Sequence, residues 1–317
     1  MDRRPPPDPL VPRWTHRHRQ RRPALRTTPH PCPRPRPDRH GPRRDLARLA
    51  TPPRPRPPRS GVLARPEHGS LTGVHLTRIG LTPLKGARHT DLDRVHLDPT
   101  GPRGDRLYCL LETGRDRVLR TVDNPTMVLV TAAWDGADLT VTTPGEGTVT
   151  AAPLPTGEVR TCSYWDRAAR LEVMTSPHAD QLSAHLGRHV RLARIRTAGE
   201  VVYGGSVTLV TTGALRRLCE AQDSRFRATF TVAAEQDPEP GTFLQVGGAT
   251  VRVRGPVPRC RVVDINPDTA ALDTRHLHTI AGQGRAERDV PFGIDADVVT
   301  PGEARLGDAV TPVPSPG

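Results

Sequence analysis

The sequence is poor in several features that would place it at once in a functional class. Aromatic residues make up 3% of its 317 residues, and its only lysine is Lys85, although lysine and arginine together number 46. No stretch approaches the roughly 18 consecutive apolar residues that cross a bilayer, and no apolar stretch typical of a signal peptide follows the Arg-rich start. We therefore expect a cytoplasmic protein with no membrane partner.

Familiar catalytic signatures are also absent. The sequence has no GxGxxG, GxxxxGK[ST], GxSxG or HExxH motif, so it lacks the usual dinucleotide, phosphate-loop, serine-hydrolase and zinc-protease patterns. The five cysteines, at positions 32, 109, 162, 219 and 260, form no CxxC pair and are odd in number. Neither a zinc site nor a disulfide framework is indicated, and each thiol has to be assessed by its own surroundings.

The positive charge is concentrated in one segment. The formal net charge is +12, but residues 1–60 contain 17 Arg and 4 Asp with no Lys or Glu, which gives +13 and leaves −1 for residues 61–317. The same 60 residues contain 17 prolines and no apolar periodicity. We predict that residues 1–70 form a disordered Pro/Arg-rich tail, and we expect no nucleic acid to bind the nearly neutral folded core.

Three interpretations of this tail compete. An arm that binds nucleic acid or an acidic membrane would neutralise phosphates, and its binding would weaken steeply with salt. An organellar transit peptide would also be rich in Arg, but so many prolines would break the amphipathic helix that it needs. We adopt the third interpretation, a solvated extension or a misplaced translation start whose composition reflects nucleotide bias.

The remainder of the chain contains short β-type segments separated by turn residues. Gly247-Gly248 is predicted to form the hairpin turn between two of them, and Ser176-Pro177 is typical of a helix start. We predict an α+β fold, mainly β, with two β-barrel-like domains and peripheral helices, over residues 72–165 and 166–313. The predicted strands cover residues 74–76, 92–97, 107–111, 127–132, 139–143, 207–211, 228–233, 244–246, 249–253, 262–265 and 294–299, and the predicted helices cover 176–187, 214–219 and 273–281.

Two positions in the first half are candidates for binding an anion. Lys85 stands out because arginine fills every other cationic position, and a compact ammonium is not replaceable by a planar guanidinium at a tight anion site. The glycine-flanked turn from Gly101 to Arg106 allows close approach of a ligand to the backbone, and Arg106 can clamp a phosphate. The structural alternatives are an ordinary surface lysine and a turn capped by Asp105 with Arg106 in a surface ion pair.

Two further candidates lie in the second half. Arg225 and Arg227 would lie on the same side of an extended segment, which suits a phosphate-bearing ligand, although an edge strand protected by charge would look the same. Cys260 stands between Arg259 and Arg261, a positive environment that favours the thiolate, the form that ligates soft metals or attacks sulfur. Of the five thiols it is the strongest candidate for chemistry.

These motifs, in this order, resemble MOSC proteins with the N-terminal MOSC β-barrel, including the mitochondrial amidoxime-reducing component and its bacterial relatives. MOSC names the C-terminal domain of molybdenum cofactor sulfurase. The resemblance extends from about residue 72 to residue 313. It rests on Pro83-Leu84-Lys85, Gly104-Asp105-Arg106, Arg225-Phe226-Arg227, Arg259-Cys260 and Asn266-Pro267-Asp268-Thr269.

The resemblance implies a molybdenum-pterin cofactor, with Cys260 as the catalytic thiolate on the metal. It also departs from the family pattern, because Gly86 stands where the family often has serine and Thr229 stands where it has asparagine. At Gly86 a backbone amide can replace the lost hydroxyl contact. The cofactor-binding residues implied are Lys85, Gly86, Arg106, Thr211, Thr212, Arg225, Arg227, Thr229 and Arg259.

The activity implied is an oxidoreductase that reduces N-hydroxylated or related N-oxygenated small molecules by oxygen-atom transfer. Its electrons would come from a separate donor protein of the ferredoxin or flavin reductase type, because the chain lacks the four cysteines of a fused plant-type ferredoxin. The alternative is a sulfur-transfer protein that carries a persulfide on Cys260. A nucleic-acid-binding function depends only on the tail, and we rank it last.

Overall fold

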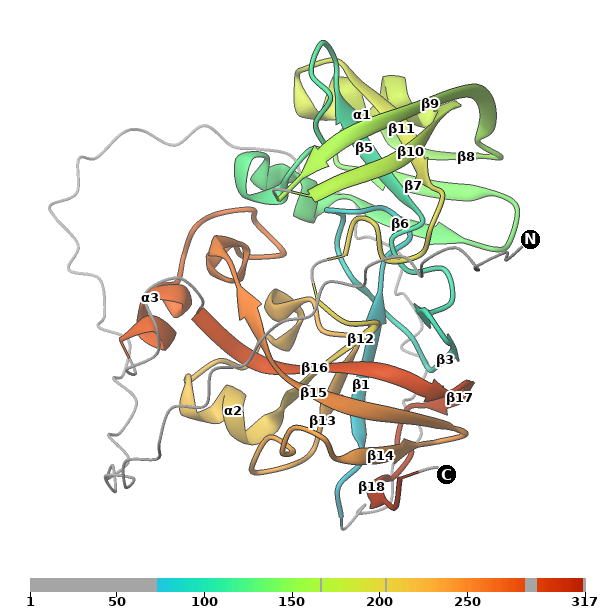
Figure 1. Cartoon of the computed structure of the whole chain (residues 1–317). Coiled ribbons are helices and arrows are strands. Elements are labelled where there is room, and N and C mark those ends of the chain that lie inside the picture. The colour runs from blue at the N-terminus through green and yellow to red at the C-terminus, as the bar shows by residue number, and fades with distance from the viewer. Residues whose placement is uncertain (1–72, 166, 203, 283–289, 316–317) are drawn as a thin grey trace, which may run out of the picture. The chain divides into compact units, whose positions relative to one another are not determined.

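The structure is a computed structural model that describes residues 73–315 except 166, 203 and 283–289, so the predicted tail at residues 1–70 lies outside the described residues. The described part consists mainly of strands, with a few short helices at the periphery (Figure 1). This confirms the predicted α+β, mainly β fold. None of its helices is long and apolar enough to cross a membrane.

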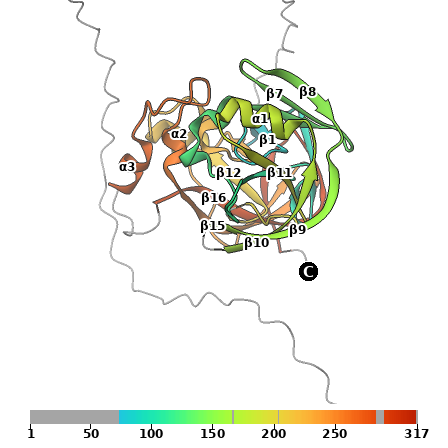
Figure 2. The same cartoon turned by 90° about the horizontal axis from the view of Figure 1, so that it is seen from above.

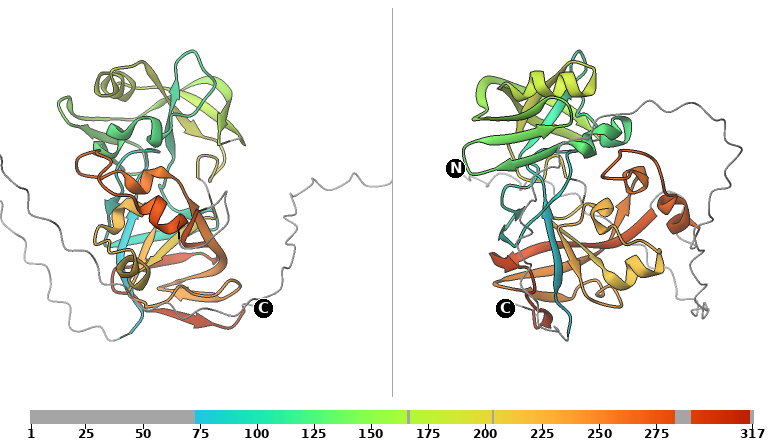
Figure 3. Two further views of the ribbon diagram at one scale, coloured as in Figure 1. Left: turned by 90° about the vertical axis from the view of Figure 1, so that its left-hand side faces the viewer. Right: turned by 180° about the vertical axis from the view of Figure 1, so that it is seen from behind.

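The largest sheet has eight strands in the order β18-β14-β15-β16-β12-β13-β1-β2. β1 comes from the start of the described chain but pairs with β13, with Leu76 opposite Val232 and Ile79 opposite Phe230. Figure 3 shows this cyan strand among the yellow-to-red strands of the C-terminal half. The strands are β1 (Leu76–Leu81), β2 (Thr90–Asp91), β12 (Val207–Thr211), β13 (Phe230–Val232), β14 (Phe243–Val246), β15 (Ala249–Arg259), β16 (Val290–Thr300) and β18 (Val310–Val313).

The inward-facing side chains of this sheet form one apolar core. Leu76, Val207, Phe230 and Val251 are each at most 1% exposed and belong to the same cluster. Burying such side chains stabilises the fold by about 1.5–3 kcal/mol each. The predicted hairpin turn at Gly247-Gly248 is confirmed, because Val246 pairs with Ala249 across it.

A second group of strands covers the first half of the chain. A four-stranded sheet has the order β5-β11-β10-β9 and a three-stranded sheet has the order β6-β7-β8, and α1 packs beside them (Figure 2). As predicted, this helix ends at a glycine, since Gly187 adopts φ 63°. The elements are β5 (Tyr108–Glu112), β6 (Thr131–Trp134), β7 (Leu139–Thr143), β8 (Gly147–Ala151), β9 (Leu154–Tyr164), β10 (Arg167–Thr175), β11 (Val190–Ile195) and α1 (His178–Leu186).

The sheet pairings bear on where one domain ends. The predicted boundary between residues 165 and 166 falls in the turn that joins β9 to β10, and these two strands pair along most of their length. β11 then pairs with β5, with Val190 opposite Glu112. A cut at residue 165 would therefore divide one sheet, and strand pairing of the first half continues to Ile195.

Short elements connect the two groups of strands. A small sheet joins β17 to β3 and β3 to β4, so the first half of the chain also contacts the C-terminal strands. These remaining elements are β3 (Arg94–Asp98), β4 (Gly101–Pro102), β17 (Gly302–Arg305), α2 (Thr212–Arg217), α3 (His276–Ala281), and the 3₁₀ turns η1 (Thr121–Asp123), η2 (Pro125–Leu129), η3 (Asp223–Phe226) and η4 (Arg261–Asp264).

Two predicted strands are wrong. Residues 127–129 lie in the 3₁₀ turn η2, and β6 begins only at Thr131; Pro125 fixes a helical φ at the start of this turn. Residues 262–264 lie in η4. In both places apolar side chains are buried by a short turn, and a brief apolar run cannot distinguish a turn from a strand.

Candidate functional site

The strongest candidate site is a cavity of about 120 Å³ at the end of β15. The chain reaches it from separate segments: the turn before β5, the η3 turn, and the junction of β15 with η4. Six of the residues selected from the sequence line it, namely Lys85, Arg106, Arg225, Arg227, Arg259 and Cys260.

Cys260 is the residue between β15 and η4. Its extended backbone, with φ −119° and ψ 177°, precedes the 3₁₀ turn, and its free thiol is only partly buried. Cys109 and Cys162, by contrast, are buried on strands β5 and β9 of the four-stranded sheet, and burial raises the pKa of both thiols. Their environment fits packing residues, whereas Cys260 remains accessible to a ligand.

Arg259 lies beside Cys260 and is held by backbone carbonyls. Its Nε donates to the Phe292 carbonyl and its Nη1 donates to the Phe226 carbonyl, both at 2.7 Å. The remaining nitrogen, Nη2, is buried without a hydrogen-bond partner. Burial lowers the pKa of Arg259 to about 10, while the nearby Cys260 acts in the opposite direction.

Arg227 presents a second unsatisfied guanidinium. Its backbone is left-handed, with φ 51°, which is uncommon for a residue other than glycine. Its Nη2 is also buried without a partner, and burial followed by repulsion from Arg106 lowers the pKa of Arg227 to about 10. Within the part of the chain that the structure describes, no carboxylate lies within 4.0 Å of Lys85, Arg227 or Arg259.

Arg106 enters the cavity from the glycine turn. It too has a left-handed backbone, with φ 49°, and follows Gly104 at φ 88°. Its Nη1 donates to Asp105 at 2.6 Å, and its Nη2 donates to the Arg227 carbonyl at 3.2 Å. The alternative predicted from the sequence was a surface ion pair of Arg106. Its ion pair is instead with Asp105 and largely buried, and Arg106 lines the cavity at the same time.

Lys85 is positioned by the neighbouring strand. Its amide donates to the Tyr108 carbonyl at 2.7 Å, and its Nζ lies 5.3 Å from the centre of the Tyr164 ring. An aromatic face attracts a cation placed over it. The Tyr164 ring therefore supports the Lys85 side chain, which lines the cavity.

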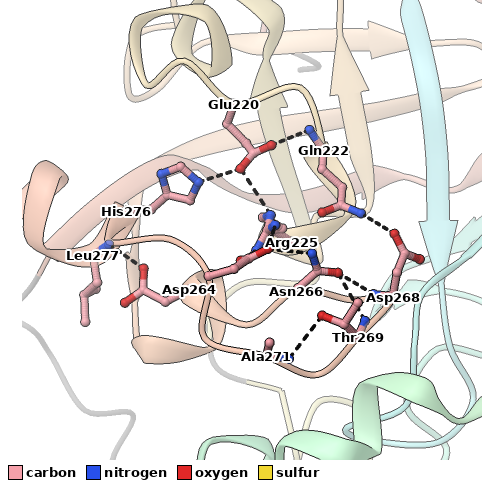
Figure 4. A network of polar contacts seen from close by, with 11 residues as sticks. Glu220, Gln222, Arg225, Asp264, Asn266, Asp268, Thr269, Ala271, His276 and Leu277 are labelled. Carbon is pink, nitrogen blue, oxygen red and sulfur yellow. Dashed lines mark hydrogen bonds and ion pairs between the residues drawn. The ribbon is translucent and has the colours of Figure 1, made fainter. Parts of the chain in front are cut away.

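Arg225 differs from the other cations, and here the prediction that it shares a face with Arg227 is wrong. The segment is the 3₁₀ turn η3 and is not extended. The Arg225 guanidinium binds Asp273 through both terminal nitrogens, at 2.8 and 3.1 Å, and its Nε lies 3.1 Å from Glu220. These acids satisfy its charge, so Arg225 stabilises the loops around it, and Figure 4 shows its contact with Glu220.

The hydrogen bonds and ion pairs around Arg225 connect the η3 turn with the loop that follows Cys260. Glu220 also contacts His276 at 2.5 Å, and Asn266 donates to Asp273 at 2.6 Å (Figure 4). Asn266 belongs to the loop that follows Cys260. The Asn266 side chain also accepts hydrogen bonds from the backbone amides of Asp268 and Thr269. The motif Asn266-Pro267-Asp268-Thr269 thus stabilises the loop that follows Cys260.

The other residues selected from the sequence do not line the cavity. Thr211 caps α2 by accepting from Ala214, while Thr212 donates to Ala234. Thr229 is buried, and its hydroxyl accepts from the amide of Thr208, which does line the cavity. Gly86 lies directly behind the wall, because a Cβ there would approach Thr121, another lining residue, at 3.2 Å. Thr229 and Gly86 thus lie against lining residues of the cavity, whereas Thr211 and Thr212 organise the start of α2.

Sequence reasoning missed several residues around the cavity. Thr121 and Val202 line it, Tyr164 supports Lys85, and His89 contacts Arg106. None stands in a motif, since each is brought here by the folding of distant segments. In the described ranges no group of three or more His, Cys, Asp or Glu side chains converges on a possible metal site, so a metal at Cys260 would have to bring most of its own ligands.

Comparison with protein families agrees with these observations. The model of the MOSC N-terminal beta barrel domain matches residues 74–189, and that of the MOSC domain matches residues 166–311. Among curated proteins no significant match was found.

Several solved structures are similar to the chain. The YuaD protein of Bacillus subtilis is 12% identical with a TM-score of 0.34, covering 75% of this chain and 93% of that protein. YiiM of Geobacillus stearothermophilus is 18% identical with a TM-score of 0.26, covering 34% of this chain and 54% of that protein. YiiM of Escherichia coli is 13% identical with a TM-score of 0.26, over 35% and 56%.

Proposed function

Since the chain belongs to the MOSC-domain proteins that carry the N-terminal MOSC β-barrel, we propose that it binds the molybdenum-pterin cofactor and reduces N-hydroxylated or related N-oxygenated small molecules. The observation that supports this most directly is the meeting of one accessible thiol with several cations in one cavity. Cys260 offers a soft ligand, and molybdenum is a metal that accepts one.

The donor set fits an anionic cofactor. The buried Nη2 atoms of Arg227 and Arg259 have no partner in the part of the chain that the structure describes, and a buried cation without a counterion costs several kcal/mol. A phosphate bearing two negative charges would offset that cost through charge-assisted hydrogen bonds. The cavity itself takes only a small group, and Val202 also lines a second cavity of about 370 Å³.

Each side chain has a defined role in this proposal. Cys260 would hold the metal, while Lys85, Arg106, Arg227 and Arg259 would orient the cofactor and offset its charge. When bound, the cofactor supplies the oxygen-atom transfer chemistry, which releases the substrate oxygen as water and consumes two electrons and two protons. A separate ferredoxin or flavin reductase would supply the electrons.

Metal and pterin content test the proposal. The full chain is produced in a host that synthesises the cofactor, molybdenum is measured by elemental mass spectrometry, and pterin is measured by fluorescence. We expect near-stoichiometric metal in the wild-type protein and at least a tenfold loss in Cys260→Ala. Cys162→Ala is the matched control, because that thiol is buried, and it should retain the metal. A folded wild-type protein without metal or pterin would contradict the proposal.

Sulfur transfer is the second candidate function, and the partial exposure of Cys260 favours it. The Cys260 thiolate would attack the terminal sulfur of a donor persulfide, form a new S–S bond and release the donor thiolate. This reaction needs no cluster of cations. Persulfide detected at Cys260 by mass spectrometry, unchanged in Lys85→Met and Arg227→Met and without bound pterin, would favour sulfur transfer over the cofactor.

A further inference from the structure

His89 lies behind the cavity and contacts one of its cations. It stands between Arg88 and β2 and is 5% exposed. Its Nε2 lies 3.1 Å from Nη2 of Arg106. No sequence motif includes it, and it is not part of the cofactor-binding set proposed above.

The contact fixes the state of the imidazole. A guanidinium has only hydrogen-bond donors, so Nε2 of His89 must be the acceptor, and the ring proton must be on Nδ1. A doubly protonated ring would have no acceptor and would place a positive charge against Arg106. The contact therefore calls for a neutral ring with its proton on Nδ1, a nitrogen that is itself buried without a hydrogen-bond partner among the described residues.

The surroundings of His89 favour that neutral ring. Burial lowers its pKa well below the ordinary value, and the charges of Arg227, Arg106, Arg78 and Lys85 lower it further. Nearby carboxylates already bind arginines: Asp105 accepts from Arg106, and the exposed Asp91 accepts from Arg78. None of them offsets the repulsion of a charged imidazole.

Arg106 depends on three acceptors that come from different segments. These are the Asp105 carboxylate, the His89 ring and the Arg227 carbonyl, which share its two terminal nitrogens. His89 and Arg227 both contact Nη2. The same nitrogen of Arg106 thus contacts both the His89 ring and the backbone of Arg227, which links His89 to two of the cavity cations.

We infer that His89 is a positioning residue whose neutral imidazole fixes the Arg106 guanidinium for anion binding, and that protonation of His89 sets a lower pH limit on that binding. The inference rests on the proposed function, because it assigns the cavity to an anionic ligand. It adds a residue and a pH dependence that the family resemblance does not supply.

Sulfate binding to the full-length protein, prepared without cofactor, tests the inference. Sulfate keeps its two charges from pH 8 to pH 5, so a change in affinity reports on the protein. In His89→Leu, which lacks the acceptor, we expect affinity to fall by roughly tenfold at pH 7.5, the usual effect of losing a hydrogen bond to a charged group. In His89→Gln, whose side-chain oxygen can accept from Arg106, affinity should stay within about threefold of wild type.

The pH profile separates positioning from a merely structural role. Wild-type affinity should hold at neutral pH and fall once the pH drops below 6.5 and reaches the lowered pKa of His89. The His89→Gln profile should lack this fall. His178→Gln is the matched control, because His178 is also buried with a lowered pKa but binds the Leu139 carbonyl in the other group of strands. It should keep the wild-type profile.

A measurement on wild-type protein avoids variants that fail to fold. Long-range ¹H–¹⁵N spectra of the imidazole rings should show His89 neutral and protonated on Nδ1 at pH 7. Protonation on Nε2, equal sulfate affinity in wild type and His89→Leu, or the same pH profile in wild type and His89→Gln would overturn the inference, as would an absence of sulfate binding. Failure of the proposed function would appear separately, as wild-type protein without molybdenum from a cofactor-producing host.

Discussion

Arg225 and Arg227 are two residues apart and line the same cavity, but their environments are opposite. Arg225 is bound by two carboxylates of the protein, Asp273 and Glu220. Among the described residues, Arg227 has no carboxylate within ion-pair distance, and one of its nitrogens is buried without a partner. A charge satisfied by the protein stabilises the fold, whereas a charge left unsatisfied is available to a ligand. The difference separates a structural arginine from a candidate binding residue.

Replacing Arg225 should give the largest effect on stability. Arg225→Met leaves the Glu220 carboxylate, which is 10% exposed, without its guanidinium partner, and removing one member of a buried pair costs about 3–5 kcal/mol. We expect the free energy of unfolding, measured with urea on the full chain, to fall by at least about 3 kcal/mol. Glu303→Gln, which breaks the exposed pair with Arg305, should change it by less than about 0.5 kcal/mol.

Equal effects of Arg225→Met and Glu303→Gln would show that the Figure 4 network does not organise the loops. In that case Arg225 could not be called a residue that stabilises the fold, and it would no longer differ from Arg227 in this respect.

Replacing Arg227 should raise the stability of the protein and weaken its binding of an anion. Arg227→Met keeps a Cβ on the left-handed backbone and removes only the desolvated charge, so the unfolding free energy without ligand at pH 7 should rise by about 1 kcal/mol. Sulfate affinity should fall by roughly tenfold, since a charge-assisted hydrogen bond is lost. Urea unfolding and sulfate titration on the same preparation check both effects. A loss of stability as large as that of Arg225→Met would contradict the distinction.

A smaller effect is the pH dependence of stability that arises from the buried, neutral side chains of His89 and His178. Burial lowers the pKa of His89 and His178, so near pH 6 the unfolded chain binds protons that the folded protein does not. The unfolding free energy should therefore decrease as the pH falls below about 6.5, by about 1 kcal/mol between pH 7 and pH 6. Urea unfolding at these two pH values measures it.

The double variant His89→Gln/His178→Gln should lose most of this pH dependence. Asp273, whose pKa is lowered mainly by its hydrogen bonds with Arg225, contributes in a separate and more acidic window. Its stabilisation is present above its ordinary pKa and is lost only as the pH falls below about 4. An unchanged slope near pH 6 in the double variant would assign the effect to other groups.

Much of the site could be predicted because it depends on residue type. The single lysine, the glycine turn before Arg106 and the cysteine between arginines each signalled a special environment, and the structure brings Lys85, Arg106, Arg259 and Cys260 together. Arg225 was misassigned because an alternating pattern was taken for an extended segment, while the chain forms a 3₁₀ turn. The local pattern does not reveal such a turn, because Asp273, which binds both terminal nitrogens of Arg225, comes from a distant segment.

The fold shows the same limit. The predicted strands at residues 107–111 and 139–143 correspond to β5 and β7 because their apolar side chains are buried. β9 is one of the longest strands but was missed, because it is largely exposed and has few apolar residues. His89 could not be found from the sequence, since its role depends on a contact with Arg106, 17 positions away.

The pairing of β1 with β13 has a consequence for the order in which the molecule folds. Leu76 cannot pair with Val232 until that residue has been synthesised, which takes a ribosome roughly ten to thirty seconds more at ordinary rates of synthesis. The four-stranded sheet β5-β11-β10-β9 joins strands that are nearer to one another in the sequence, so it can form during that interval. Lys85 and Arg106 are therefore made early and Cys260 late, so a nascent chain has no complete cavity until most of it has been translated.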